Sequence, residues 1–139
     1  GLRIGYLVAH QSIVNKLRQH KIPWSVNSLA QIAGERVLKD SYYFKATHLM
    51  IEEERNFLSV QLKKIKGLKV YPSVANFLLF KIEKDKIRAN DLTKRLLKKE
   101  ILVRDCSNFR NLNNKFIRVA VRNRKENQKL IVALREILI

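Results

Sequence analysis

The sequence of 139 residues contains a single cysteine, Cys106, and lacks long apolar stretches. One thiol excludes an internal disulfide and a zinc site built from several cysteines, and such sparse use of cysteine is typical of a reducing compartment. A membrane-spanning helix needs roughly 20 apolar residues in succession, and neither such a run nor a secretory signal pattern occurs. We therefore expect a cytoplasmic protein without a membrane partner.

Aromatic residues make up only 8% of the sequence, although lysine and arginine give it a formal net charge of +17. Nucleic-acid-binding modules concentrate their charge on one element and add aromatic side chains that stack on bases. Here the basic residues are spread along the whole chain and do not alternate with the aromatic residues. We therefore interpret the charge as a solvated basic surface, and keep a basic α/β nucleic-acid-binding module as the alternative from another functional class.

The residues that are present predict a folded chain. A hydrophobic content of 46% suffices for a packed core, whereas disordered segments combine high charge with low hydrophobicity. The sequence begins GLRIGYLVAH, without a methionine, and its large apolar residues alternate over residues 2–9. This alternation predicts a β-strand, and the abrupt beginning leads us to expect a part cut from a longer protein.

The spacing of apolar residues predicts three successive helices, over residues 10–20, 21–40 and 41–66. Pro23 and Ser25 are start signals for the second helix, and Gly67 is a stop signal for the third. The third helix also contains the acidic run Glu52-Glu53-Glu54. Because consecutive helical residues point in different directions, they do not converge on one ion. We expect this run to form a solvated face rather than a metal site.

The pattern changes after Gly67. It predicts two short strands within residues 68–82, a helix over 88–99, and strands over 101–103 and 116–121. Asn123, with Glu126 three residues later, has the spacing of a capping box that begins a last helix. The order β-β-α-β-β-α predicts an α/β (α+β) fold in which helices pack on a sheet.

Two arginines accompany the last two predicted strands: Arg104 follows the first, and Arg118 lies inside the second. Alternation places Arg118 on the face opposite Ile117 and Val119. A guanidinium in that position needs an anion, and its planar fork suits a carboxylate or a phosphate. From this stretch alone, the anion is either a local aspartate or glutamate or an external ligand.

The most distinctive stretches are GLRIGY at the start, PWSVNSLAQIA after it, and ILVRDCSNF and FIRVAVRNRKENQKLI near the end. Together they resemble fold-type I pyridoxal-phosphate aminotransferases of class I/II. The first resembles the segment that follows the Schiff-base lysine, and the second resembles the helix start that comes next. The last two resemble the C-terminal domain of the histidinol-phosphate aminotransferase group, and within it the threonine-phosphate decarboxylase branch. The resemblance covers essentially the whole chain, in order.

This resemblance implies that residues 1–40 are the tail of the large cofactor-binding domain. It implies that residues 41–139 are a long linking helix and the small C-terminal domain. Arg3 matches the arginine that contacts the cofactor phosphate, whereas the Schiff-base lysine would precede Gly1. The full-length protein is then expected to be a homodimeric enzyme that carries pyridoxal 5'-phosphate, and this chain alone is expected to be inactive.

Arg104 and Arg118 match the pair of arginines that holds the anionic groups of the substrate in this family. Arg118 would hold the carboxylate, and Arg104 would help to hold the carboxylate or the phosphate. Asn108, in the loop between them, is a candidate for the rim of the same site. The function implied is L-threonine-O-3-phosphate decarboxylase of cobalamin biosynthesis, with histidinol-phosphate aminotransferase as the alternative. Two planar cations suit such a small, strongly anionic substrate.

Other polar residues have simpler interpretations. Cys106 has no histidine near it in the sequence, so we do not expect a catalytic thiol. Asn76 lies in a recurrent Ala-Asn-Phe of the family, and we expect it to bond the end of a strand rather than the substrate. The three histidines lack the spacing of metal ligands, and no metal site is predicted.

Overall fold

The structure, a computed structural model, describes residues 2–138. Its contacts divide the chain into two compact units, Gly1–Ala46 and Thr47–Ile139, and the boundary lies inside the long helix α3, Ser41–Lys63. No helix of the described residues is long and apolar enough to cross a membrane. The assignment of the two parts to a large and a small domain stays a prediction.

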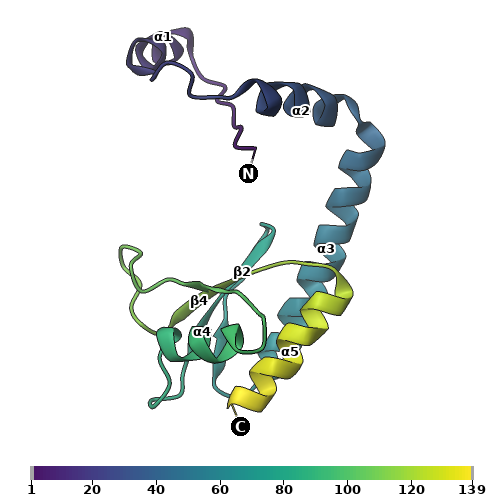
Figure 1. Cartoon of the computed structure of the whole chain (residues 1–139), viewed down its shortest axis with the longest axis vertical. Coiled ribbons are helices and arrows are strands. Elements are labelled where there is room, and N and C mark those ends of the chain that lie inside the picture. Colours follow the sequence, from purple (N-terminus) through teal and green to yellow (C-terminus); the bar gives the residue numbers. More distant parts are fainter. Residues whose placement is uncertain (1, 139) are drawn as a thin grey trace. The chain divides into compact units, whose positions relative to one another are not determined.

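The first unit contains two short helices, α1 (Gln11–His20) and α2 (Ser28–Lys39), before the start of α3 (Figure 1). Helix α2 begins where Asn27 Oδ1 accepts a hydrogen bond from the N–H of Ala30 at 2.8 Å. The predicted start at Pro23 and Ser25 is therefore wrong. The asparagine is the effective cap because its side-chain oxygen satisfies one of the amides that the first helical turn leaves free.

Residues 2–9 form no strand, which corrects the prediction from their alternation. A strand is stabilised when a neighbour pairs its N–H and C=O groups, and the four strands of the described sheet all lie in the second unit. The large apolar side chains of this segment stay exposed, with Tyr6 at 87%. Ile4 approaches α2 at Gly34, where a Cβ would lie 2.8 Å from Ile4 Cδ1.

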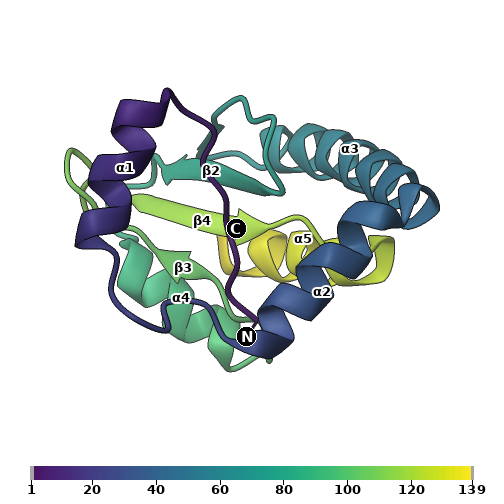
Figure 2. The same ribbon diagram turned by 90° about the horizontal axis from the view of Figure 1, so that it is seen from above.

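The second unit is built on a four-stranded antiparallel sheet (Figure 2). Its strands are β1 (Leu68–Val70), β2 (Phe77–Ile82), β3 (Arg104–Asp105) and β4 (Phe116–Ala120), in the spatial order β1-β2-β4-β3. Helices α4 (Ala89–Leu97) and α5 (Arg124–Leu138) follow β2 and β4. The predicted order β-β-α-β-β-α is therefore confirmed.

One face of this sheet forms the core with α3, α4 and α5. Alternate residues of the two central strands point to that face and are buried: Leu78, Phe80, Ile82, Ile117 and Val119. Each helix contributes a pair of buried leucines: Leu58 and Leu62, Leu92 and Leu96, and Leu130 and Leu134. Burying each such side chain stabilises the fold by about 1.5–3 kcal/mol before entropy is counted. Within the second unit, α3, α4 and α5 therefore cover the face of the sheet that carries these buried residues.

Strand β3 begins later than predicted, because the ladder to β4 starts at Arg104 and not within residues 101–103. The N–H of Ile101 is bonded to the carbonyl of Leu96 at 3.0 Å, in the turn that ends α4. Glu100 stands in this turn with a φ of 60°. An amide that closes the end of a helix is not available to a sheet, so the strand starts after it.

The acidic run over residues 52–54 is not a solvated face throughout, which corrects the prediction for Glu54. This residue is 7% exposed. Its carboxylate accepts hydrogen bonds from Arg124 Nε and from Asn127 Nδ2, both at 2.8 Å. Because neighbouring helical residues point in different directions, one glutamate of the run meets α5 and joins that helix to α3.

Helix α5 begins at the predicted cap. Asn123 Oδ1 accepts a hydrogen bond from the N–H of Glu126 at 3.0 Å, which confirms Asn123 as the capping residue. The carboxylate of Glu126 forms an ion pair with Arg122 Nη2 at 2.9 Å. This pair takes the place of the reciprocal bond that a complete capping box would have.

Candidate functional site

Strands β3 and β4 place two arginines directly opposite each other. Arg104 and Arg118 are partners in the antiparallel ladder. Directly opposite residues of neighbouring strands project from the same face of a sheet. Both side chains therefore leave the face turned away from the core residues Ile117 and Val119.

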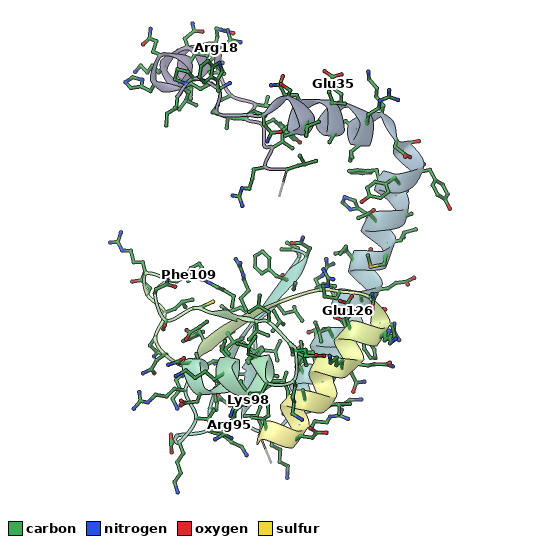
Figure 3. The ribbon with its side chains drawn as sticks, in the orientation of Figure 1. Arg18, Glu35, Arg95, Lys98, Phe109 and Glu126 are labelled. Atoms are coloured by element: carbon green, nitrogen blue, oxygen red, sulfur yellow. The ribbon has the colours of Figure 1, made fainter. Side chains whose placement is uncertain are left out.

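We call this surface the open face. Its residues come from all four strands and none of them is buried: Lys69, Tyr71, Phe77, Leu79, Lys81, Arg104, Phe116, Arg118 and Ala120. All four charged side chains in this set are basic. Other basic residues are exposed on helices or at their ends, such as Arg18 on α1, Arg95 on α4 and Lys98 directly after α4 (Figure 3). The open face thus combines cations that lie far apart in the sequence.

Neither arginine of the pair has a carboxylate partner in the described part of the chain. The cations of the ion pairs between described residues are Lys99, Arg122, Arg124 and Lys129. Asp105, next to Arg104, accepts a hydrogen bond from the N–H of Ser107 at 2.8 Å. Pairing of Arg118 with a local aspartate or glutamate, the first of the two predicted alternatives, is therefore not supported. Its guanidinium is available to an external anion.

An aromatic ring lies against each of the two guanidinium groups. Arg118 Cζ lies 4.9 Å from the ring centre of Phe77, and Arg104 Cζ lies 5.4 Å from that of Phe109. Arg104 Nη2 also donates a hydrogen bond to Asn108 Oδ1 at 3.1 Å. Phe109 and Asn108 belong to the loop between β3 and β4, where Phe109 is labelled in Figure 3. Two residues of this loop therefore contact Arg104, which lies before it in the chain.

Phe77 and Phe109 were not predicted for the site, because the contact of a ring with a cation depends on register and loop conformation. For Phe77 the available signal was its place at the start of a predicted strand, after Asn76. That asparagine does serve the strand end through its main chain, because its carbonyl accepts a hydrogen bond from the N–H of Val121 at 2.8 Å.

Cys106 is 1% exposed and is the first residue of the loop after β3. Its N–H is bonded to the carbonyl of Phe116 at 3.0 Å, and its Sγ lies 3.6 Å from the carbonyl oxygen of Arg104. Burial raises the pKa of the Cys106 thiol, and the positive charges of Arg118 and Arg104 only partly oppose this effect. The thiol therefore stays protonated at neutral pH, and its contribution is to anchor the loop.

Arg3 lies in the first unit and is exposed. Among residues 2–138, no carboxylate forms an ion pair with it. In the second unit, a cavity of about 360 Å³ is lined by the segment before β3 and by residues of β4 and α5; Val103, Val119 and Arg122 are among its lining residues. Neither arginine of the pair lines this cavity. No cluster of three histidine, cysteine or acidic residues in the described chain could hold a metal ion.

The amino-acid pattern and the fold both match known proteins. Residues 1–134 match the family described as aminotransferase class I and II. The chain is 41% identical to threonine-phosphate decarboxylase of Salmonella typhimurium, over 99% of this chain and 37% of that protein. It is 44% identical to histidinol-phosphate aminotransferase of Caldanaerobacter subterraneus subsp. tengcongensis, over 99% of this chain and 38% of that protein.

Among solved structures, L-threonine-O-3-phosphate decarboxylase from Porphyromonas gingivalis superimposes with a TM-score of 0.83 at 31% identity. The superposition covers 99% of this chain and 42% of the other. The chain therefore spans less than half the length of these relatives.

Proposed function

The chain belongs to the aminotransferase class I and II family, and from this premise we propose that it is the C-terminal part of a pyridoxal-phosphate enzyme that acts on a small phosphorylated amino acid or amino alcohol. The observation that carries the proposal is the pair Arg104 and Arg118, which share one face of the sheet and have no carboxylate partner among the described residues. The names of the relatives support the substrate class, since each contains a phosphorylated amino compound.

Two fixed guanidinium groups can bind and orient such a substrate. Each planar fork can donate two parallel hydrogen bonds to a carboxylate or a phosphate. In the proposal, Arg118 holds the carboxylate and Arg104 assists or holds the phosphate. By fixing where the carboxylate lies, Arg118 determines which bond at the substrate α-carbon is aligned for cleavage, and thereby favours loss of carbon dioxide or of a proton.

The first unit contains a cation at the position that would meet the cofactor phosphate: Arg3 is exposed and forms no ion pair with a carboxylate of the described residues. Arg3 would donate hydrogen bonds to the cofactor phosphate, which requires a guanidinium without a carboxylate partner. When bound, pyridoxal phosphate stabilises negative charge on the substrate α-carbon. We propose that the lysine that bonds it covalently lies outside this sequence, so that residues 1–139 alone bind it weakly and do not turn over.

Between the two activities named by the relatives, we propose threonine-phosphate decarboxylase, in the pathway to cobalamin. The support is the match to that enzyme from two organisms, by sequence and by structure. Histidinol-phosphate aminotransferase is the second candidate, because one such enzyme is 44% identical to the chain. In either case we propose a cytoplasmic homodimer, a state that light scattering by the complete protein would measure.

Assays of the complete protein with its cofactor decide between these functions. We expect release of carbon dioxide from O-phospho-L-threonine, and little transfer of the amino group of histidinol phosphate to 2-oxoglutarate. The reverse pattern would select the aminotransferase. Activity on neither substrate would refute the proposed substrate class and leave the family membership intact.

Replacing Arg3 with alanine tests the cofactor contact. The change removes charge-assisted hydrogen bonds worth about 1.5–3 kcal/mol, so the Kd for pyridoxal phosphate should rise about 10- to 100-fold. Titration of the complete apoprotein, followed by the absorbance of the bound cofactor, measures this. Arg18→Ala is the matched control, because Arg18 is an exposed arginine on α1. Equal affinities of the two variants for the cofactor would contradict the role of Arg3.

A further inference from the structure

We propose that Phe77 and Phe109 are positioning residues that hold the two substrate-binding guanidinium groups in place before the substrate arrives. Phe77 positions Arg118, and Phe109 positions Arg104, in both cases through contact between the cation and the face of a ring. The inference rests on the proposed function and adds to it the residues that prepare the arginines for an anion.

The pair needs such support because its charges are alike. Arg104 and Arg118 are directly opposite in an antiparallel ladder, which brings the Cα atoms to within roughly 4.5–5.5 Å of each other. Like charges in this arrangement destabilise a sheet. No carboxylate of the described residues neutralises either of them. An aromatic ring can stabilise a cation through its quadrupole without neutralising it.

The register explains how Phe77 reaches its arginine. Phe77 is paired across the sheet with Ala120, while Leu79 is paired with Arg118, so the ring is the diagonal neighbour of the guanidinium. The small side chain of Ala120 leaves room for the ring to lean along the sheet. Phe77 is 38% exposed on the open face, whereas the next aromatic residue of the strand, Phe80, is fully buried in the core. The ring at position 77 therefore serves the open face.

The loop after β3 supports Phe109 in the same way. The N–H of Phe109 is bonded to the carbonyl of Cys106, and the N–H of Cys106 is bonded to the carbonyl of Phe116 on β4, each at 3.0 Å. Because Cys106 is buried, this chain of bonds fixes the loop to the sheet. The guanidinium of Arg104 is then held by the Phe109 ring and by Asn108 Oδ1.

This mode of support keeps the hydrogen-bond donors available. A ring attracts the face of a guanidinium, whereas a carboxylate occupies its N–H groups. Arg122 illustrates the second case, since both its Nε and Nη2 donate to Glu126. No carboxylate of residues 2–138 pairs with the fork of Arg118, and Arg104 commits one nitrogen to Asn108. A side chain already held in place loses less entropy when the substrate binds.

The test uses the complete protein with its cofactor and the variants Phe77→Leu and Phe109→Leu. Each should raise KM for O-phospho-L-threonine about three- to fivefold and change kcat by less than about twofold, in keeping with the strength of an exposed cation–π contact. Phe77→Tyr keeps a ring and should restore KM. Phe57→Leu is the matched control: it removes a ring 3.9 Å from Arg124, an arginine that is already paired with Glu54. Its KM should stay unchanged.

Nuclear magnetic resonance of arginine-labelled protein gives a second readout that needs no turnover. The side-chain signals of Arg118 should be shifted upfield by the Phe77 ring, lose that shift in Phe77→Leu and keep it in Phe77→Tyr. Absence of the shift from the unchanged protein would overturn the contact. An unchanged KM in both leucine variants would overturn the positioning role, as would the same rise in Phe57→Leu. If the unchanged protein accepts neither phosphorylated substrate, the proposed function itself fails, and with it the role of the rings.

Discussion

Replacing Arg118 with lysine should lower kcat/KM for the phosphorylated substrate by about 100-fold, because the bidentate, charge-assisted pair of hydrogen bonds to the carboxylate is lost. Lysine keeps the charge but presents it as a point on a flexible stem, so it cannot reproduce the planar fork. Arg118 is half-buried on the open face, where its Cζ lies 4.9 Å from the ring centre of Phe77. Steady-state kinetics of the complete protein would measure the effect.

Arg122→Lys is the matched control for this experiment. Arg122 lies in the same segment of the chain, just after the end of β4. It is paired with Glu126 at the surface, and such exposed pairs contribute at most about 1 kcal/mol to stability. Its kcat/KM should stay within about threefold of the unchanged protein. If Arg118→Lys behaves like this control, with circular dichroism showing both variants folded, then Arg118 does not hold the substrate.

Replacing Asn127 with alanine should lower the free energy of unfolding by about 3 kcal/mol, the largest effect on stability that we expect from a polar side chain here. Asn127 is 1% exposed and is the centre of a buried polar network. Its Nδ2 donates to Glu54 Oε2 at 2.8 Å and to the carbonyl of Arg122 at 2.7 Å, and its Oδ1 accepts from the N–H of Arg122 at 3.1 Å. Alanine would leave a buried carboxylate oxygen and two main-chain groups without these partners.

Asn123→Ala provides the comparison, because it removes an asparagine from the same end of α5 that makes a capping bond at the surface. Loss of a cap should cost about 1 kcal/mol. Denaturant unfolding of both variants measures the difference. Equal losses of stability would show that the network around Asn127 contributes no more than a single cap and would contradict its central place.

Local patterns were enough to predict much of this chain. Helix α5 and its cap at Asn123 follow from apolar spacing and one side-chain oxygen, both of which act within a few residues. The position of Arg118 on the face away from Ile117 follows from the two-residue period of a strand. The order of strands and helices could also be predicted from local sequence patterns. The resemblance to the family rests on short stretches, those around Arg104 and Arg118 among them.

Features that depend on a distant partner could not be predicted. Residues 2–9 have the alternating pattern of a strand but pair with no strand of the described sheet. The sequence of one strand does not determine which other strand it pairs with. Glu54 becomes buried because α5, about 70 residues later in the chain, supplies Arg124 and Asn127. The tertiary structure likewise decided that Phe77 and Phe109, rather than acidic residues, meet the two arginines. In each case sequence determines which groups are present, and strand register and helix packing determine which of them come into contact.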